Sequence, residues 1–230
     1  MIHHVSKVCA QCAAVAHVPK EMVQFSSSAP PSKPGAQFAC DVMCREKQRI
    51  LVLRDVHTSF TKAAIIKDER SQTLKDALIQ LSAELKDTDG CDVRVDGAAG
   101  FRSLANDSTL HDFGIHLEVG DVKNKNKNPV AEKSILELEC EIKKAKPEGG
   151  PISPSFLAIV VRILNDRIRN RGLSAKELLF QRDGQSGQQI VFNDSQMADR
   201  QYDISVQNHP HNSKSKSGKG KHSHKFFKPG

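Results

Sequence analysis

The stretch Val93–Lys144 constrains the fold and the chemistry of this chain more than any other. Asp96 closes a short β-branched run, so it is expected to lie at the end of a strand. Glu132 lies just inside a helical pattern that Pro129 opens, since proline suits the first turn of a helix. The two carboxylates are separated by 35 residues. Carboxylates gathered from separate elements are typical of metal-assisted phosphoryl transfer, in which two divalent cations lie roughly 4 Å apart.

Further motifs accompany the two carboxylates. The motif GAAGF follows Asp96 directly, a short apolar strand pattern follows Gly114, and the motif KNKNPVAEK contains Glu132. In this order and at this spacing, the motifs resemble the integrase core of LTR retrotransposons, in particular that of the gypsy-class elements of animals. The resemblance covers roughly Val8 to Asn208.

This resemblance implies a fold, an activity and catalytic residues. The fold is α/β and ribonuclease-H-like, with a mixed five-stranded sheet flanked by helices. The activity is metal-dependent polynucleotidyl transfer on DNA, in which 3′-end processing and strand transfer lead to DNA integration. Asp96 and Glu132 would be two of three catalytic carboxylates that hold two Mg²⁺ or Mn²⁺ ions. Magnesium suits a site whose ligands are all oxygen atoms.

The third carboxylate is either Asp41 or Asp55, each of which lies beside an apolar run. The residues alone do not separate these candidates. In the family's pattern the first catalytic aspartate lies in the first strand, ahead of a hairpin turn, so the resemblance implies Asp41. Asp41 and Asp96 would then hold one ion, and Asp41 and Glu132 the other. Asp55 would be a non-catalytic residue that ends the second strand.

Hydrophobic periodicity predicts strands and helices in alternation. A stripe of leucines predicts a helix over 71–85, and Ser153 with Pro154 begins a longer helix over 153–169, which Gly172 ends. The strand over 91–96 is expected to be central, because its apolar residues need cover. The other expected elements are strands over 37–43, 50–54, 61–66 and 115–119, a short helix within 101–113, the helix opened by Pro129, and a short helix after a capping box of Ser174 and Glu177. This order also allows other mixed α/β sheets.

The positive charge of the chain is concentrated in its tail. The net charge is +7, but six lysines follow the last acidic residue, Asp203, so residues 1–203 carry +1. Lysines attract DNA phosphates without reading sequence. The lysines expected to contact DNA lie in a polar loop and in the tail: Lys123, Lys125, Lys127, Lys214, Lys216, Lys219 and Lys221. Composition alone equally allows the loop lysines to be merely solvated.

Three regions are expected along the chain. Residues 1–34 would be the remnant of a zinc-binding N-terminal region with a linker, residues 35–183 the catalytic core, and residues 184–230 a basic, disordered tail. Cys9 and Cys12 supply only two of the four ligands that tetrahedral zinc needs. The resemblance implies a histidine pair far upstream, which this sequence does not show. We therefore expect no zinc site, and a core truncated at both ends relative to the family.

The sequence also favours an intracellular protein, nuclear or cytoplasmic. It has no apolar run near the roughly 20 residues that span a bilayer, and no signal peptide is evident. The longest apolar run, FLAIVV, is expected to be buried, and the family resemblance implies that part of its helix serves homo-oligomer formation. Six cysteines without a disulfide framework suit a reduced compartment. The expected partner is DNA, without membrane contact.

Two other functions fit part of these observations. A catalytically inactive, nucleic-acid-binding relic of a retrotransposon would explain the missing flanking modules, whereas the carboxylate triplet favours the enzyme. A ribonuclease H would share the fold and the metal ions. It would not explain the motif KNKNPVAEK at its distance from Asp96.

Overall fold

The computed structural model of the chain describes residues 33–120, 128–169 and 173–190. The predicted N-terminal remnant and basic tail lie almost wholly outside these residues. So do Cys9, Cys12 and all seven lysines predicted to contact DNA. The predictions made for these residues therefore remain predictions. None of the helices described is both long and apolar enough to cross a membrane.

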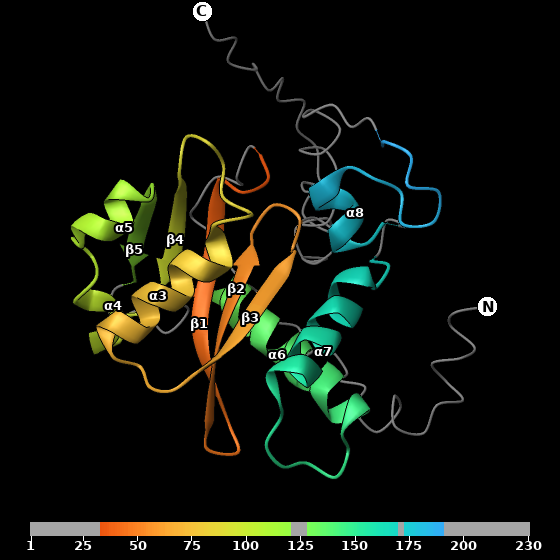
Figure 1. Ribbon diagram of the computed structural model, residues 1–230, viewed down its shortest axis with the longest axis horizontal. Helices are drawn as coiled ribbons and strands as arrows, with labels where there is room; N and C mark the ends of the chain where they lie inside the picture. Colours follow the sequence, from red (N-terminus) through yellow and green to blue (C-terminus); the bar gives the residue numbers. More distant parts are fainter. Residues whose placement is uncertain (1–32, 121–127, 170–172, 191–230) are drawn as a thin grey trace, which may run out of the picture.

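A mixed sheet of five strands in the order β3-β2-β1-β4-β5 forms the centre of the molecule (Figure 1). Its first three strands are antiparallel neighbours, whereas β4 runs parallel to β1 and β5 parallel to β4. The strands are β1 (Gln37–Arg45), β2 (Gln48–Asp55), β3 (Thr61–Ile66), β4 (Cys91–Val95) and β5 (Ile115–Val119). All five predicted strands are therefore present, as is the mixed sheet. Strand β4 lies inside the sheet between β1 and β5, as expected for a strand whose apolar residues need cover, and the third of the five strands is β1.

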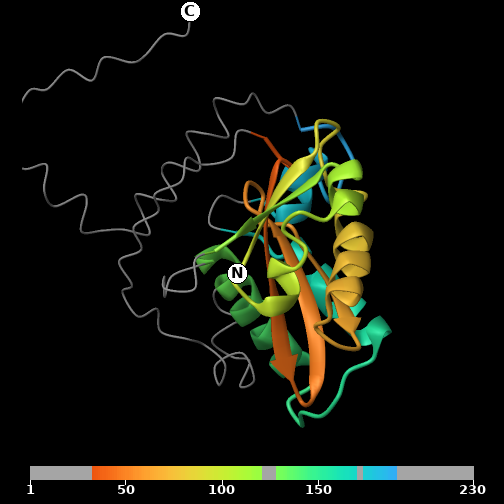
Figure 2. The same ribbon diagram turned by 90° about the vertical axis from the view of Figure 1, so that its left-hand side faces the viewer.

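One face of the sheet is covered by α3 (Ser71–Ser82) (Figures 1 and 2). The predicted leucine stripe is buried there against Phe38 of β1 and Val93 of β4. The helix ends three residues earlier than the predicted Leu85, which is nevertheless buried in the same core. The single short helix predicted within 101–113 is two helices, α4 (Ala99–Arg102) and α5 (Ser108–Asp112).

The other face packs against α6 (Pro129–Ala145) and α7 (Pro154–Asp166). Its core joins apolar residues of β1 and β2 to Leu138 and Ile142 of α6 and to Leu157, Val160 and Leu164 of α7. The helix α7 stops before the predicted residue 169, because Arg167 already has extended backbone, so Gly172 does not end it. The run FLAIVV is also not wholly buried, since Ile159 is 59% exposed on the outer side of the helix.

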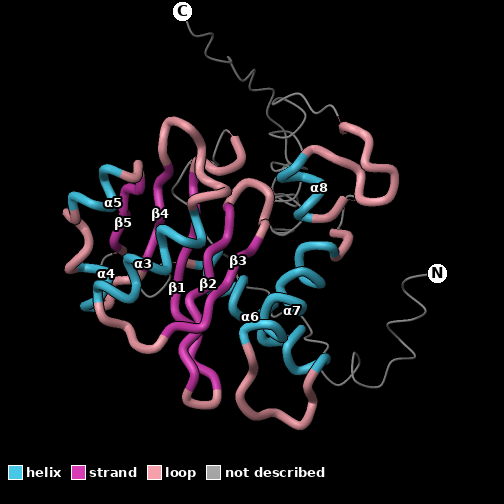
Figure 3. The backbone as a smooth tube through the Cα atoms, viewed as in Figure 1, coloured by secondary structure: helices cyan, strands magenta, loops and turns pink. Residues whose placement is uncertain are grey.

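Hydrogen bonds tie the β1–β2 hairpin to the connection between α6 and α7, and the two lie side by side at one end of the molecule (Figure 3). Gln48 donates to Ile152 O at 2.9 Å and accepts from Ile152 N–H at 2.7 Å. Arg45 donates to Gly150 O at 2.7 Å. The predicted capping box of Ser174 opens the last helix, α8 (Ala175–Phe180). The two layers of helices thereby hold a rigid sheet, on which the candidate site is built.

Candidate active site

Asp41 lies on β1, and Asp96 directly follows β4, the parallel neighbour of β1. The register pairs Gln37 with Asp92 and Ala39 with Arg94. The pairing ends there, and Asp41 and Asp96 each follow two residues after this last pair, close enough for the charge of Asp96 to raise the pKa of Asp41. Since side chains alternate between the faces of a sheet, both aspartates belong to the face that carries α6.

Glu132 comes to this place from the first turn of α6. Its backbone N–H donates to Asn128 O at 3.0 Å, so the first helical turn begins at Asn128. The Asn128 side chain in turn donates to the backbone of both aspartate-bearing segments, at Cys40 O and Arg94 O. The Glu132 side chain is exposed, whereas Asp41 and Asp96 are half-buried. The three predicted catalytic residues thus come from three elements joined at one point.

The charges of these carboxylates act on one another. Burial raises the pKa of Asp41, a hydrogen bond from Val42 N–H at 2.7 Å opposes this, and the charges of Asp96, Glu132 and Glu69 add to the rise. The resulting pKa of Asp41 is about 6. A carboxyl group with a raised pKa among other acids gains from a nearby cation. The electrostatics therefore suit a site for divalent metal ions with oxygen ligands.

The candidate carboxylates nevertheless do not already surround a position for a metal ion. Among the described residues, no three Asp, Glu, His or Cys side chains are placed so that they could hold a metal ion together. Of the three carboxylates, Glu132 is the most exposed, and an exposed side chain changes rotamer easily. The donor chemistry thus fits a divalent cation, and closing the site around one would need side-chain movement.

Glu69 is a fourth acidic group near Asp41 that sequence reasoning missed. It lies between β3 and α3, and it accepts from Arg49 of β2 at 2.9 Å. Its charge contributes to the raised pKa of Asp41. The segment Lys67–Arg70 consists of two acidic residues between two basic ones, as solvated loops commonly do. No signal in the sequence separates Glu69 from its neighbours.

The other acidic residues of α6 are engaged with cationic side chains. Glu137 is paired with Arg54, Arg167 and Arg169. Glu139 and Glu141 also have basic partners within 3.5 Å. Glu132 forms no such pair with any residue that the structure describes. This difference distinguishes Glu132 from the remaining glutamates of its helix on physical grounds.

Asp55 has a structural environment quite unlike that of Asp41. Its side chain is fully buried and accepts from Gly35 N–H at 2.9 Å and from both the N–H and the hydroxyl of Thr58 at 2.6 Å. Burial raises the pKa of Asp55, and these hydrogen bonds oppose the rise. The carboxylate thereby fixes the turn after β2 to the segment before β1. Its hydrogen-bond donors leave little room for a metal ion.

Asp55→Asn is expected to lower stability and to leave metal binding unchanged. The new NH₂ group must face N–H or O–H donors, so at least one hydrogen bond is lost, at a cost of about 1–2 kcal/mol. Thermal melting of the parent and the variant, each with and without Mn²⁺, measures both effects. A variant that melts lower but gains as much from Mn²⁺ as the parent agrees with this view. Loss of the Mn²⁺ effect would make Asp55 a ligand.

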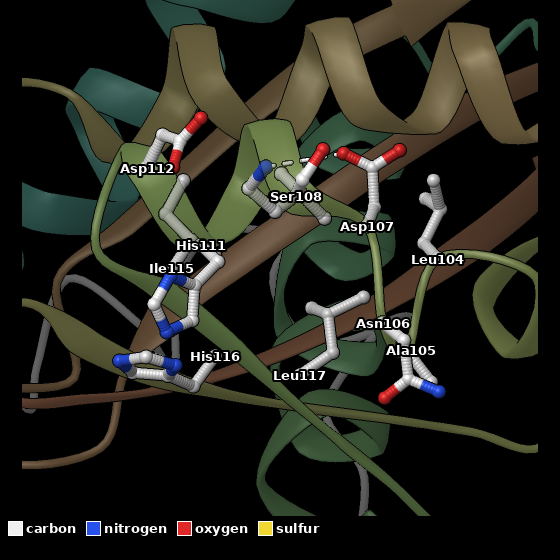
Figure 4. A pocket seen from close by; sticks show the side chains of 11 residues that line it. Leu104, Ala105, Asn106, Asp107, Ser108, His111, Asp112, Ile115, His116 and Leu117 are labelled. Atoms are coloured by element: carbon white, nitrogen blue, oxygen red, sulfur yellow. Dashed lines mark hydrogen bonds between the residues drawn. The ribbon is translucent and has the colours of Figure 1, made fainter.

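A surface cavity of about 560 Å³ opens between α5 and β5 (Figure 4). His111 and His116 line it, with their rings edge to face and their centroids 5.2 Å apart. None of the three candidate catalytic carboxylates lines this cavity. It is therefore not part of the candidate active site.

Comparisons with known proteins find a similar fold. No family model matches the chain, and no curated protein matches its sequence. Among solved structures, the catalytic core domain of BIV integrase matches with a TM-score of 0.53 and 18% sequence identity, over 64% of this chain and 94% of that one. At this identity the similarity shows a shared fold. The predicted ribonuclease-H-like fold is thereby confirmed.

Proposed function

We propose that this chain is an integrase-type polynucleotidyl transferase core, which cuts and joins DNA with the help of Mg²⁺ or Mn²⁺. The observation that supports the proposal is the influence of the charges of Asp96 and Glu132 on Asp41, three residues from separate parts of a fold shared with an integrase catalytic core. The raised pKa of Asp41 supports it, since the group gains from a bound cation. The motifs of the sequence favour a gypsy-class retrotransposon as the source.

Each carboxylate has a part in this proposal. Asp41 would share both ions, one with Asp96 and one with Glu132. Bound divalent ions would supply activation of the attacking hydroxyl group and stabilisation of the leaving oxygen in an in-line displacement. The sheet and the first turn of α6 would position the backbones of the ligands, and side-chain movement, above all of the exposed Glu132, would close the site around the ions. No covalent nucleophile from the protein is required.

The partner is proposed to be DNA, with the protein acting in the nucleus or the cytoplasm and able to form homo-oligomers. The loop lysines Lys123, Lys125 and Lys127 would contact phosphates beside the site, and the tail lysines would add affinity without sequence preference. The exposed Ile159 of α7 gives an apolar surface on which a second copy could pack.

Deleting residues 209–230 is expected to weaken DNA binding sharply at low salt. The deletion removes the six tail lysines and, with them, up to six counterion-releasing contacts. The slope of log K against log salt should therefore flatten, by roughly 0.9 for each lost phosphate contact. Fluorescence anisotropy with labelled duplex DNA between about 50 and 200 mM salt measures both quantities. Unchanged affinity and slope would assign DNA binding to the core.

The decisive experiment is a nicking and strand-transfer assay on retroelement-end DNA with Mg²⁺ or Mn²⁺. The parent chain should cut and join DNA only with metal, and the Asp96→Asn variant should do neither. An RNA–DNA hybrid in a parallel reaction tests for a ribonuclease H. A parent chain that neither nicks DNA nor gains stability from metal would refute the enzyme.

One observation favours a second candidate, a non-catalytic nucleic-acid-binding relic. The described residues contain no group of three acidic, histidine or cysteine side chains already arranged around a metal position. A relic would bind DNA with a normal salt dependence and show no metal-dependent cleavage. The same assay, read together with DNA binding, separates the two candidates.

A further inference from the structure

The side chain of Asn128 lies where the pairing between β1 and β4 ends. The parallel pairing of these strands ends at Ala39 and Arg94. Beyond that point the carbonyls of Cys40 and Arg94 need other donors, because a buried carbonyl without a partner is costly. The Asn128 Nδ2 group donates to both, at 3.0 and 2.9 Å. An amide NH₂ carries two hydrogens, one for each carbonyl.

The same side chain begins α6. Asn128 Oδ1 accepts from Ala131 N–H at 3.4 Å, as an N-cap residue does. Its backbone oxygen accepts from Glu132 N–H at 3.0 Å. Asn128 is 3% exposed, and its side-chain bonds to Cys40 O and Ala131 N–H are buried, whereas the bond to Arg94 O is partly buried. Only an amide of this length can cap the helix with its oxygen while its nitrogen bridges two strands.

The bonds of Asn128 reach every element that carries a candidate ligand. Cys40 directly precedes Asp41, Arg94 lies two residues before Asp96, and Glu132 lies one helical turn after Asn128. We propose that Asn128 is a positioning residue, which sets the spacing of the three carboxylates and thereby the affinity for divalent metal. This inference rests on the proposed function. Removal of a residue that orients metal ligands typically lowers metal affinity by about 10–100-fold, so a loose junction weakens binding.

Asn165 provides a matched control for this proposal. It is 4% exposed, and its amide also joins two elements, accepting from Thr61 N–H at 2.8 Å and donating to Thr61 O at 2.7 Å. This second amide fastens the end of α7 to β3. Among the described residues its side-chain hydrogen bonds go to Thr61 alone, and none joins it to a segment that carries Asp41, Asp96 or Glu132. Substitution of either asparagine should lower the stability of the fold, whereas only substitution of Asn128 should weaken the binding of divalent metal.

The test compares Asn128→Ser with Asn165→Ser in the full chain. Serine keeps an oxygen for the helix cap but cannot bridge the two carbonyls. Mn²⁺ affinity is measured by the loss of the free-ion EPR signal, and stability by melting without metal. We expect both variants to melt lower, with the apparent Kd for Mn²⁺ raised about tenfold or more in Asn128→Ser. In Asn165→Ser it should stay within about twofold of the parent value.

A second variant, Asn128→Asp, keeps the shape and the cap but loses both donated hydrogen bonds. Its added negative charge alone would tighten cation binding, so weaker Mn²⁺ binding there must come from lost positioning. Asn128→Asp also tests the positioning role if Asn128→Ser does not fold. Parent-like or tighter Mn²⁺ binding in the folded Asn128 variants overturns the positioning role and leaves the proposed function standing. A parent chain that binds no Mn²⁺ overturns both.

Discussion

Asp41→Asn is expected to abolish Mn²⁺-dependent nicking and, without metal at pH 8, to raise the melting temperature. Loss of a shared metal ligand removes several kcal/mol of transition-state stabilisation, so the rate should fall at least about a hundredfold. The gain in stability has a separate cause. In the metal-free fold, the half-buried Asp41 carboxylate is charged among other acids, and asparagine removes that charge.

The stabilisation should depend on pH in a defined window. Burial, with the charges of Asp96, Glu132 and Glu69, raises the pKa of Asp41 from 3.8 to about 6 in the folded protein. The folded state therefore binds this proton more tightly than the unfolded state, and the parent loses stability as pH rises through this range. The gain from Asp41→Asn should be near zero at about pH 4 and complete above about pH 6.

The size of the effect follows from the same shift. A change of about two pKa units corresponds to roughly 3 kcal/mol, but solvent screens a partly exposed carboxylate, so we expect about 1–2 kcal/mol. That is a rise of roughly 3–6 °C for a domain of this size. Melting curves of parent and variant in EDTA from pH 4 to 8 measure it. An equal or lower melting temperature at pH 8 would contradict the electrostatic account.

The companion variants make the assignment specific. Asp96→Asn and Glu132→Gln should also stop cleavage, because neither amide replaces a negatively charged ligand. Asp55→Asn should remain active below its lowered melting temperature. An inactive Asp55→Asn beside an active Asp41→Asn would reverse the choice between the two aspartates.

The fold could be predicted because its signals are local. Each strand of the sheet carries its own alternating or continuous apolar pattern, and β3 begins and ends where the pattern does. The pairing of strands is less accessible. β1 is the middle strand only because β5 pairs with the outer side of β4. The short apolar patterns of β4 and β5 do not indicate which strands pair with each other.

The site could be predicted only in part. The spacing of Asp96 and Glu132 indicated two carboxylates, but the choice of Asp41 depended on the family resemblance. Asn128 stood inside the recognised motif KNKNPVAEK without any sign of its role, since its partners Cys40 and Arg94 are distant in sequence. A single polar residue shows its burial only once the chain has folded around it.

Arg54 is a second polar residue whose burial could not be predicted from the sequence. It ends an apolar strand and has the appearance of a surface residue, yet it is 2% exposed and paired with Glu137 of α6. Burial alone would raise the pKa of Glu137, but the charges of Arg54, Arg169 and Arg167 outweigh it and lower that pKa to about 2. A buried arginine needs such a partner.

Glu137→Gln is accordingly expected to be among the most destabilising single substitutions in this chain. It keeps the shape and a hydrogen-bond acceptor but leaves the Arg54 charge buried without compensation, at a cost of about 3–5 kcal/mol. For a domain of this size the melting temperature should fall by roughly 10 °C. Glu84→Gln is the control, because Glu84 contacts Lys62 at 2.7 Å but is 78% exposed. Its loss should change the melting temperature little.

The pH dependence of Glu137→Gln runs opposite to that of Asp41→Asn. The pKa of Glu137 is about 2 in the folded protein, below the ordinary 4.5, so the charged form stabilises the fold. That stability is present above about pH 4.5 and is lost as pH falls toward 2, so the two proteins should converge in acid. Arg54→Met combined with Glu137→Leu should recover much of the loss, because apolar residues of similar volume replace a buried ion pair well. A Glu137→Gln variant as stable as the parent at pH 7 would show that water reaches Arg54.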